Sequence, residues 1–142
     1  WELLQAPAHA GVRKLVRELN RLYAGRTALH ALDCEPEGFE WLVADDATQS
    51  IFCWLRRDRD GNEVIVLANF TPQPRPGYRV GLPEGAGACW RVALDTDAGE
   101  FGGSGAFAAR DTIDVETVAA HGRTRSLRVD VPPLATLFLV PA

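Results

Sequence analysis

From residue 33 onward, the sequence alternates short runs of β-forming residues with clusters of turn-forming residues. The turn clusters include Asp60-Gly61-Asn62 and Pro83-Glu84-Gly85. Seven short strands at such spacing are typical of an antiparallel β-sandwich made of two sheets. The sequence therefore predicts a mainly β fold, with strands at 39–43, 50–57, 63–70, 78–82, 89–94, 126–131 and 135–140.

The apolar residues predict which strands are covered on one face and which on both. Leu127, Val129 and Val131 alternate with polar residues, as in a strand with one buried face. By contrast, the runs 64–68 (VIVLA) and 136–140 (TLFLV) are apolar on both faces. We expect these two runs to be central strands that are covered on both sides.

An amphipathic helix is predicted at residues 9–24, where apolar side chains recur with helical spacing. Pro7 suits its first turn and Gly25 its end, and Thr27 is expected to cap a further turn at 28–32. An isolated helix of this length is marginal in water, so its apolar stripe must pack against something. Because the helix does not fit the sandwich pattern, we expect residues 1–32 to end a preceding domain and residues 33–142 to form the β domain.

Pro72, Pro74 and Pro76 alternate with other residues between two predicted strands. Each proline fixes its own φ and pushes the residue before it toward extended geometry. The favoured interpretation is a rigid bridge between strands. The alternative is a polyproline ligand for a partner protein.

Composition excludes several functions. The chain is 46% hydrophobic and 24% charged, with a net charge of -4 and no basic stripe, so no nucleic-acid partner is expected. No apolar run is long enough to span a membrane, and no signal peptide is visible. Three cysteines without pairing or ligand spacing indicate reduced thiols in a cytoplasmic protein. The histidines also lack ligand spacing, so neither a metal site nor a cofactor is predicted.

No catalytic residue is predicted. Asp45 and Asp46 lie in an expected hairpin turn. The run 95–100 (DTDAGE) lacks the full ligand set of a calcium loop and is expected to be a turn. The glycine-rich run 101–107 (FGGSGAF) is expected to be a tight surface loop.

The four tryptophans are the remaining candidates for binding. We expect Trp41 and Trp54 to be core residues of strands. Trp1 and Trp90 are candidate glucan-binding residues, because a partly exposed indole can stack on the C–H face of a sugar ring. For both residues the alternative is a half-buried tryptophan at a domain interface.

Taken together, "LNRLY…ALHALD", "GFEWL", "NFTPQPRPGYRVG" and "FGGSG" resemble the carboxyl-terminal end of bacterial 1,4-α-glucan branching enzymes of the α-amylase superfamily. The resemblance extends from Trp1 to Val140. It implies an upstream (β/α)₈ barrel whose last helix is the predicted helix, followed by a C-terminal β-sandwich. The three catalytic carboxylates of the family lie in that barrel, and none matches a position in this sequence.

The resemblance implies an enzyme that moves a cleaved α-1,4-glucan chain to a 6-hydroxyl group, forming an α-1,6 branch. We expect this chain to be a fragment of such an enzyme, because it lacks methionine and begins with tryptophan. It would support the barrel and contact α-glucan. The alternatives are a structural brace without sugar contact and a protein-interaction module. Separated from the barrel, the apolar helix is expected either to fold back on the sandwich or to cause self-association.

Overall fold

The computed structural model describes residue 2, residues 6–107 and residues 112–142. Within these residues the chain forms one α-helix, α1 (Pro7–Gly25), three single 3₁₀ turns and eight strands. The turns are η2 (Thr27–Leu29), η3 (Pro36–Gly38) and η4 (Gly99–Phe101). The strands are β1 (Phe39–Asp46), β2 (Ile51–Arg57), β3 (Glu63–Asn69), β4 (Arg75–Leu82), β5 (Cys89–Asp95), β6 (Ile113–Asp114), β7 (Arg125–Val131) and β8 (Thr136–Pro141).

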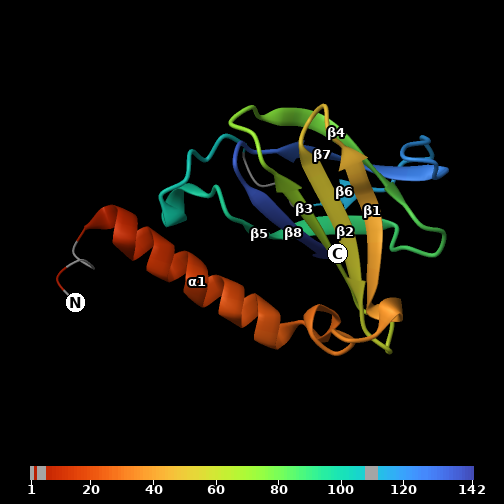
Figure 1. Cartoon of the computed structure of the whole chain (residues 1–142), viewed down its shortest axis with the longest axis horizontal. Helices are drawn as coiled ribbons and strands as arrows, with labels where there is room; N and C mark the ends of the chain where they lie inside the picture. Colours follow the sequence, from red (N-terminus) through yellow and green to blue (C-terminus); the bar gives the residue numbers. More distant parts are fainter. Residues whose placement is uncertain (1, 3–5, 108–111) are drawn as a thin grey trace.

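The strands form two antiparallel sheets, which confirms the predicted fold class (Figure 1). The larger sheet has the order β1-β2-β3-β8-β5-β6, and the smaller one pairs β4 with β7. The inward side chains of both sheets make the main core. Its largest fully buried members include Trp90, Ile51, Leu55, Leu67, Val80 and Leu127.

The two runs that are apolar on both faces form the centre of the larger sheet, as predicted. β3 lies between β2 and β8, and β8 lies between β3 and β5. Their inner faces pack toward β4 and β7. Their outer faces contribute Val64, Val66 and Val140 to a second buried cluster, which Ala28 of η2 covers.

The proline-rich segment crosses from one sheet to the other, as the bridge interpretation predicted. It leaves β3 at Asn69, whose buried side-chain amide donates hydrogen bonds to the carbonyl oxygens of Gln73 and Pro132. β4 begins at Arg75, earlier than predicted, and includes Pro76. A proline is tolerated there because β4 pairs only with β7 among the described strands. The backbone then turns at Gly77, which has a positive φ of 64°.

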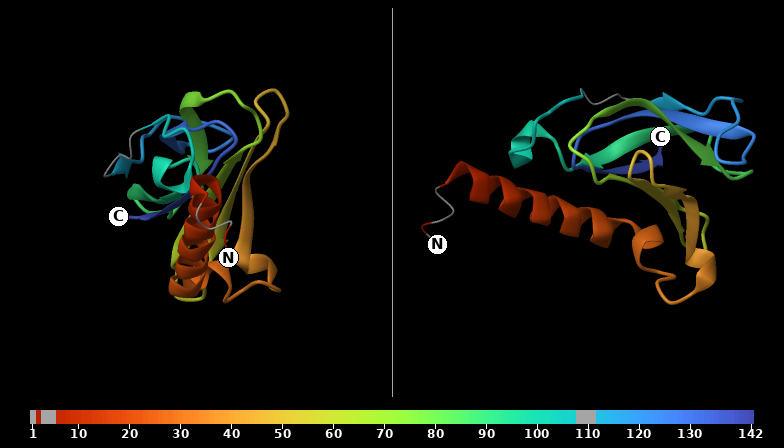
Figure 2. Two further views of the ribbon diagram at one scale, coloured as in Figure 1. Left: turned by 90° about the vertical axis from the view of Figure 1, so that its left-hand side faces the viewer. Right: turned by 45° about the horizontal axis from the view of Figure 1, so that its top comes forward.

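Helix α1 lies along the outer side of the larger sheet (Figure 2). Its buried residue is Gly11, where a Cβ atom would lie 2.3 Å from the carbonyl oxygen of Phe101 in η4. Lys14 adds an ion pair with Glu100, with 2.5 Å between Nζ and Oε2. The backbone of α1 therefore packs directly against η4.

The predicted capping role of Thr27 is wrong. The N-cap of η2 is Arg26, and no side chain caps this turn. Instead, the Thr27 hydroxyl donates a hydrogen bond to the Asp58 carboxylate at the β2–β3 turn. The Thr27 side chain therefore bonds to a residue that is distant in the sequence and does not cap the local turn.

No helix in the described residues, α1 included, is long and apolar enough to cross a membrane.

Candidate functional site

Trp90, one of the two candidate glucan-binding residues, lies in the centre of the core. None of its surface is exposed, and its indole N–H donates a 3.0 Å hydrogen bond to the carbonyl oxygen of Gly87. Neither face of the ring is accessible to a sugar in this structure. Trp1, the other candidate, lies outside the described residues. The structure therefore does not bring the two candidates together in one site.

Trp41, which was predicted to be a core residue, is 49% exposed. Strand β1 places it beside Phe39 on the outer face of the larger sheet, and its register partner is Trp54 of β2. Trp54 is only half-buried. The prediction failed for Trp41 because no described segment covers this end of the outer face.

Four exposed aromatic residues gather at this end of the sheet and are called the aromatic surface below. They are Phe39, Trp41, Phe52 and Phe70, with exposed fractions between 39% and 65%. Ring centroids lie 5.1 Å apart for Phe39 and Trp41, 6.2 Å for Trp41 and Phe52, and 5.6 Å for Phe52 and Phe70. The sequence contained a sign of this shared face. Phe39 and Trp41 are two residues apart in one strand, and Phe52 and Trp54 are two residues apart in the next, so each pair points to one side of the sheet.

A groove separates the aromatic surface from the C-terminal half of α1. Its volume is about 500 Å³, and its lining is mainly apolar. Leu19, Leu22 and Tyr23 line it from the helix, and Trp54 and Phe138 line it from the sheet. The exposed side chains Val12, Val16 and Tyr23 continue the apolar character along α1.

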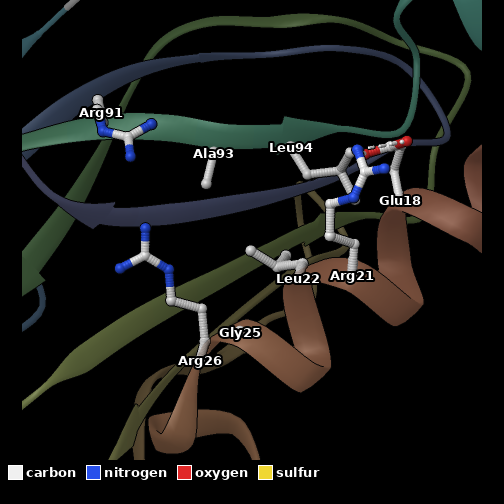
Figure 3. Close-up of a pocket in the computed structure, with 8 residues that line it drawn as sticks. All are labelled: Glu18, Arg21, Leu22, Gly25, Arg26, Arg91, Ala93 and Leu94. Carbon is white, nitrogen blue, oxygen red and sulfur yellow. Dashed lines mark hydrogen bonds and ion pairs between the residues drawn. The ribbon is translucent and has the colours of Figure 1, made fainter.

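A second, more polar pocket of about 330 Å³ lies between α1 and β5. Figure 3 shows Arg26 extending from the end of the helix and Arg91 from β5, whereas Arg21 is held by Glu18 at 2.9 Å. Among the described residues, no carboxylate forms an ion pair with Arg26 or Arg91. This pocket can therefore attract an anion, and the carboxylate that lines it, Glu18, is paired with Arg21.

The carboxylates considered in the sequence have structural roles. Asp46 accepts hydrogen bonds from the Gln49 backbone and from the Tyr78 hydroxyl. Asp97 accepts bonds from the backbone N–H and the hydroxyl of Ser104, which fold 97–104 into a compact loop. Burial by itself raises the pKa of Asp97, but these hydrogen bonds outweigh it and hold the pKa below its ordinary value. The predicted turn at 95–100 and loop at 101–107 are both present.

An ion-pair network on the other side of β1 and β2 is also structural. Glu40 accepts from Arg57 at 2.7 Å and from Arg123 at 2.6 Å, and Arg57 also donates to Glu63. Partial burial raises the pKa of Glu40, but the two guanidinium groups outweigh it, so the net shift is downward. A carboxylate held ionised in this way cannot act as a general acid near neutral pH.

The described residues contain no group of three or more His, Cys, Asp or Glu side chains that could hold a metal ion. Cys34, Cys53 and Cys89 are free thiols. Burial raises the pKa of Cys53, so this thiol is unreactive.

Comparison with known proteins places the chain in a defined family. Residues 41–142 match the family described as "Alpha amylase, C-terminal all-beta domain". The chain is 51% identical over 142 residues to the 1,4-alpha-glucan branching enzyme GlgB of Burkholderia cenocepacia (strain HI2424). The matched region is 100% of this chain and 19% of that protein. It is 47% identical over 140 residues to GlgB of Ralstonia nicotianae, covering 98% of this chain and 18% of that protein.

The chain is 46% identical over 142 residues to GlgB of Pseudomonas putida, and the match again covers 100% of this chain and 19% of the relative. The chain therefore spans about a fifth of the length of the curated relatives it matches, and the match lies in their C-terminal part. The chain belongs to the family of α-amylase C-terminal all-β domains.

Proposed function

We propose that this chain is a non-catalytic domain of a 1,4-α-glucan branching enzyme, whose α-1,6 branches form in a catalytic barrel elsewhere in the protein. The observation that supports this most strongly is the identity of about one half to branching enzymes along the entire chain. Similarity of this degree over all 142 residues includes α1 and both sheets.

The absence of a reaction centre in the described residues agrees with a supporting role. A retaining glycosyl transfer needs two carboxyl groups about 5–5.5 Å apart on either side of the scissile bond. Asp46, Asp97 and Glu40 instead accept hydrogen bonds that fix turns and join strands. The catalytic partner is the barrel of the same polypeptide.

Residues 1–32 form the end of that barrel in this proposal, and residues 33–142 form the C-terminal domain. The family match begins at residue 41, beyond α1 and η2, which supports the division. The exposed stripe on α1 supports it as well, because a helix with Val16 and Tyr23 about half exposed has not buried its apolar face.

Direct contact with α-glucan remains a proposal for Trp1 alone. Trp90 is fully buried in the main core, so it is neither an accessible glucan contact nor the half-buried interface tryptophan that was the alternative. The free thiols agree with a cytoplasmic protein, as expected for an enzyme of glycogen synthesis.

The proposed function can be tested by replacement. In the Burkholderia cenocepacia enzyme, the matched C-terminal part is replaced by this chain, and branching of amylose is followed by the fall in iodine absorbance. We expect the chimera to branch amylose and the isolated chain to leave it unchanged. A folded but inactive chimera, or an isolated chain that branches amylose, would contradict the proposal.

Glucan contact is tested separately by electrophoresis of the isolated chain in gels with and without glycogen. Retardation by glycogen that disappears in Trp1→Ala would support the contact at Trp1. Equal mobility in both gels would favour the structural brace.

A further inference from the structure

The pocket between α1 and β5 has an excess of positive charge. Arg21, Arg26 and Arg91 line it, and Glu18 is the acidic residue among its lining side chains. These four residues give the pocket a net charge of +2, in a chain whose net charge is -4. Arg21 is paired with Glu18, whereas within the described residues the guanidinium groups of Arg26 and Arg91 have neither a hydrogen-bond nor an ion-pair partner.

Strand β5 provides one wall of the pocket. Trp90 faces the core, so its neighbour Arg91 faces the outer side of the larger sheet, toward α1. The register with β8 then shifts between Val92 and Leu94. Such a shift turns two successive side chains toward one side, and Ala93 and Leu94 both line the pocket. The wall therefore combines one guanidinium group with an apolar surface.

Arg26 reaches the pocket from the opposite wall. It follows the last residue of α1, and its extended backbone, with φ of -128° and ψ of 95°, directs the chain away from the helix. Figure 3 shows the guanidinium groups of Arg26 and Arg91 pointing toward each other across the pocket. Two like charges in this position repel each other, so the arrangement is most stable when an anion lies between them.

The charge and the number of donors favour a phosphate group over a carboxylate. A guanidinium group presents five N–H donors in a planar fork that matches the oxygens of phosphate. A carboxylate carries one charge and two oxygens, so a single guanidinium group satisfies it. A phosphate monoester carries a charge of about -1.5 to -2 at pH 7 and three acceptor oxygens. It can therefore bind Arg26 and Arg91 at the same time.

We propose that the pocket between α1 and β5 is a binding site for a phosphate group, which Arg26 and Arg91 hold from two sides. The volume of about 330 Å³ lies within the range of about 300–1,000 Å³ that is usual for small-molecule sites. It has room for the phosphate group and for a small molecule that carries it against Leu22 and Leu94. The bound group joins the end of α1 to the sheet. This inference does not rest on the proposed function, because all of these residues belong to the present chain.

Nuclear magnetic resonance of the chain tests the site with inorganic phosphate. The backbone amides of residues 26 and 91 are followed at constant ionic strength, with chloride replacing phosphate. We expect saturable shifts with a dissociation constant of roughly 0.1–1 mM, as two charge-assisted contacts would give. Arg26→Gln and Arg91→Gln should each weaken binding about tenfold. Arg13→Gln is the matched control, because Arg13 is exposed on the same helix outside the pocket, and it should keep the affinity.

A second titration, with glucose 6-phosphate, distinguishes the source of the phosphate group. Tighter binding than that of inorganic phosphate would support the site and show that a phosphorylated sugar uses the apolar wall as well. Equal binding would support the site with the phosphate group alone as the recognised part. In both cases Arg91→Gln should weaken the binding.

Three results would overturn the proposal. Equal affinities of Arg91→Gln and Arg13→Gln would show an adventitious ion only. Shifts that chloride reproduces at the same ionic strength would show general screening of charge. The third result concerns the chimera with the Burkholderia cenocepacia enzyme, in which phosphate at ten times the dissociation constant should raise the melting temperature by about 2–5 °C. No rise there would show that another part of the enzyme occupies the pocket.

Discussion

At the scale of single residues, the two tryptophans Trp90 and Trp41 exchanged their expected environments. Trp90 was expected to be partly exposed, yet it pairs with Pro141 and Ile113 inside the larger sheet. Trp41 lies in a strand, which indicated burial, yet it faces outward. A strand presents its residues alternately to two faces, and only the covering layer decides which face is core.

This difference predicts that the same substitution costs more stability at Trp90 than at Trp41 in the isolated chain. Trp90→Phe removes part of a fully buried ring and leaves the Gly87 carbonyl oxygen without its donor, so we expect about 1–3 kcal/mol of lost stability. Trp41→Phe should stay within about 1 kcal/mol, because half of the ring is already in water. Urea unfolding of both variants measures this. Equal losses would mean that Trp41 is buried in solution.

Asp58 predicts a pH dependence. Its carboxylate accepts hydrogen bonds from the hydroxyl of Thr27 and from the backbone and side chain of Asn62, and these bonds lower its pKa from an ordinary value of 3.8 to about 2. A group whose pKa is lower in the folded state than in the unfolded state binds its proton preferentially when unfolded. Its contribution is therefore complete above about pH 4 and is lost as the pH falls through 2.

The matching variant is Asp58→Asn, which lacks the charge. We expect it to be less stable by about 1–3 kcal/mol at pH 7, because hydrogen bonds to a charged acceptor are stronger than those to an amide. Between pH 5 and pH 2, its stability should fall less steeply than that of the unsubstituted chain. Parallel curves for the two proteins in urea unfolding would show that the Asp58 carboxylate does not stabilise the fold.

At the scale of elements, α1 is fixed by a close backbone contact with η4. The apolar residues of the helix recur with helical spacing, and a proline lies in its first turn. Its apolar side chains nevertheless remain partly exposed. Gly11 is what permits the approach, because any Cβ atom would collide with the Phe101 carbonyl oxygen. Helix α1 was predicted from the spacing of its apolar residues, whereas its packing against η4 depends on Gly11, which has no side chain.

In Gly11→Ala, a gain in helix propensity is therefore opposed by a loss of packing between α1 and η4. Alanine favours the helix by about 1 kcal/mol, but its Cβ atom would have to displace η4. We expect lower stability and faster hydrogen exchange of the amides at 99–105. Gly25→Ala is the matched control, since nothing lies within 4 Å of its added Cβ, and it should be neutral or slightly stabilising. A stabilised Gly11→Ala would place η4 away from α1.

At the scale of the whole molecule, one side of the larger sheet is closed by β4 and β7, and the other is only partly covered. η2 covers the centre of the outer face, over Val66 and Val140. The end with Phe39 and Trp41 is open. The domain thus has a complete core and an additional apolar face.

The open face predicts self-association of the isolated chain at high concentration, because no described segment covers its apolar side chains. Static light scattering should show a mass that rises with concentration, and Val16→Asp should reduce the rise, since Val16 is 49% exposed on the stripe of α1. Val118→Asp tests whether any added charge has this effect. A constant monomer mass up to millimolar concentration would contradict the prediction.

The strands, the helix and the central position of β3 and β8 could be predicted from the sequence because they depend on local spacing. Strand β6 could not, since its two residues are ordered by pairing with Cys89 and Trp90. The role of Thr27 was missed for the same reason, because its acceptor is 31 residues away.

By itself, the sequence determined a two-sheet sandwich with a preceding amphipathic helix, because periods of two and of 3.6 residues record which side chains share a face. Only the tertiary structure decided that Trp90 is enclosed and that the rings of Phe39, Trp41, Phe52 and Phe70 meet on one open surface. The reason is physical: a side chain is buried by the layers above it, and those layers come from distant parts of the polypeptide.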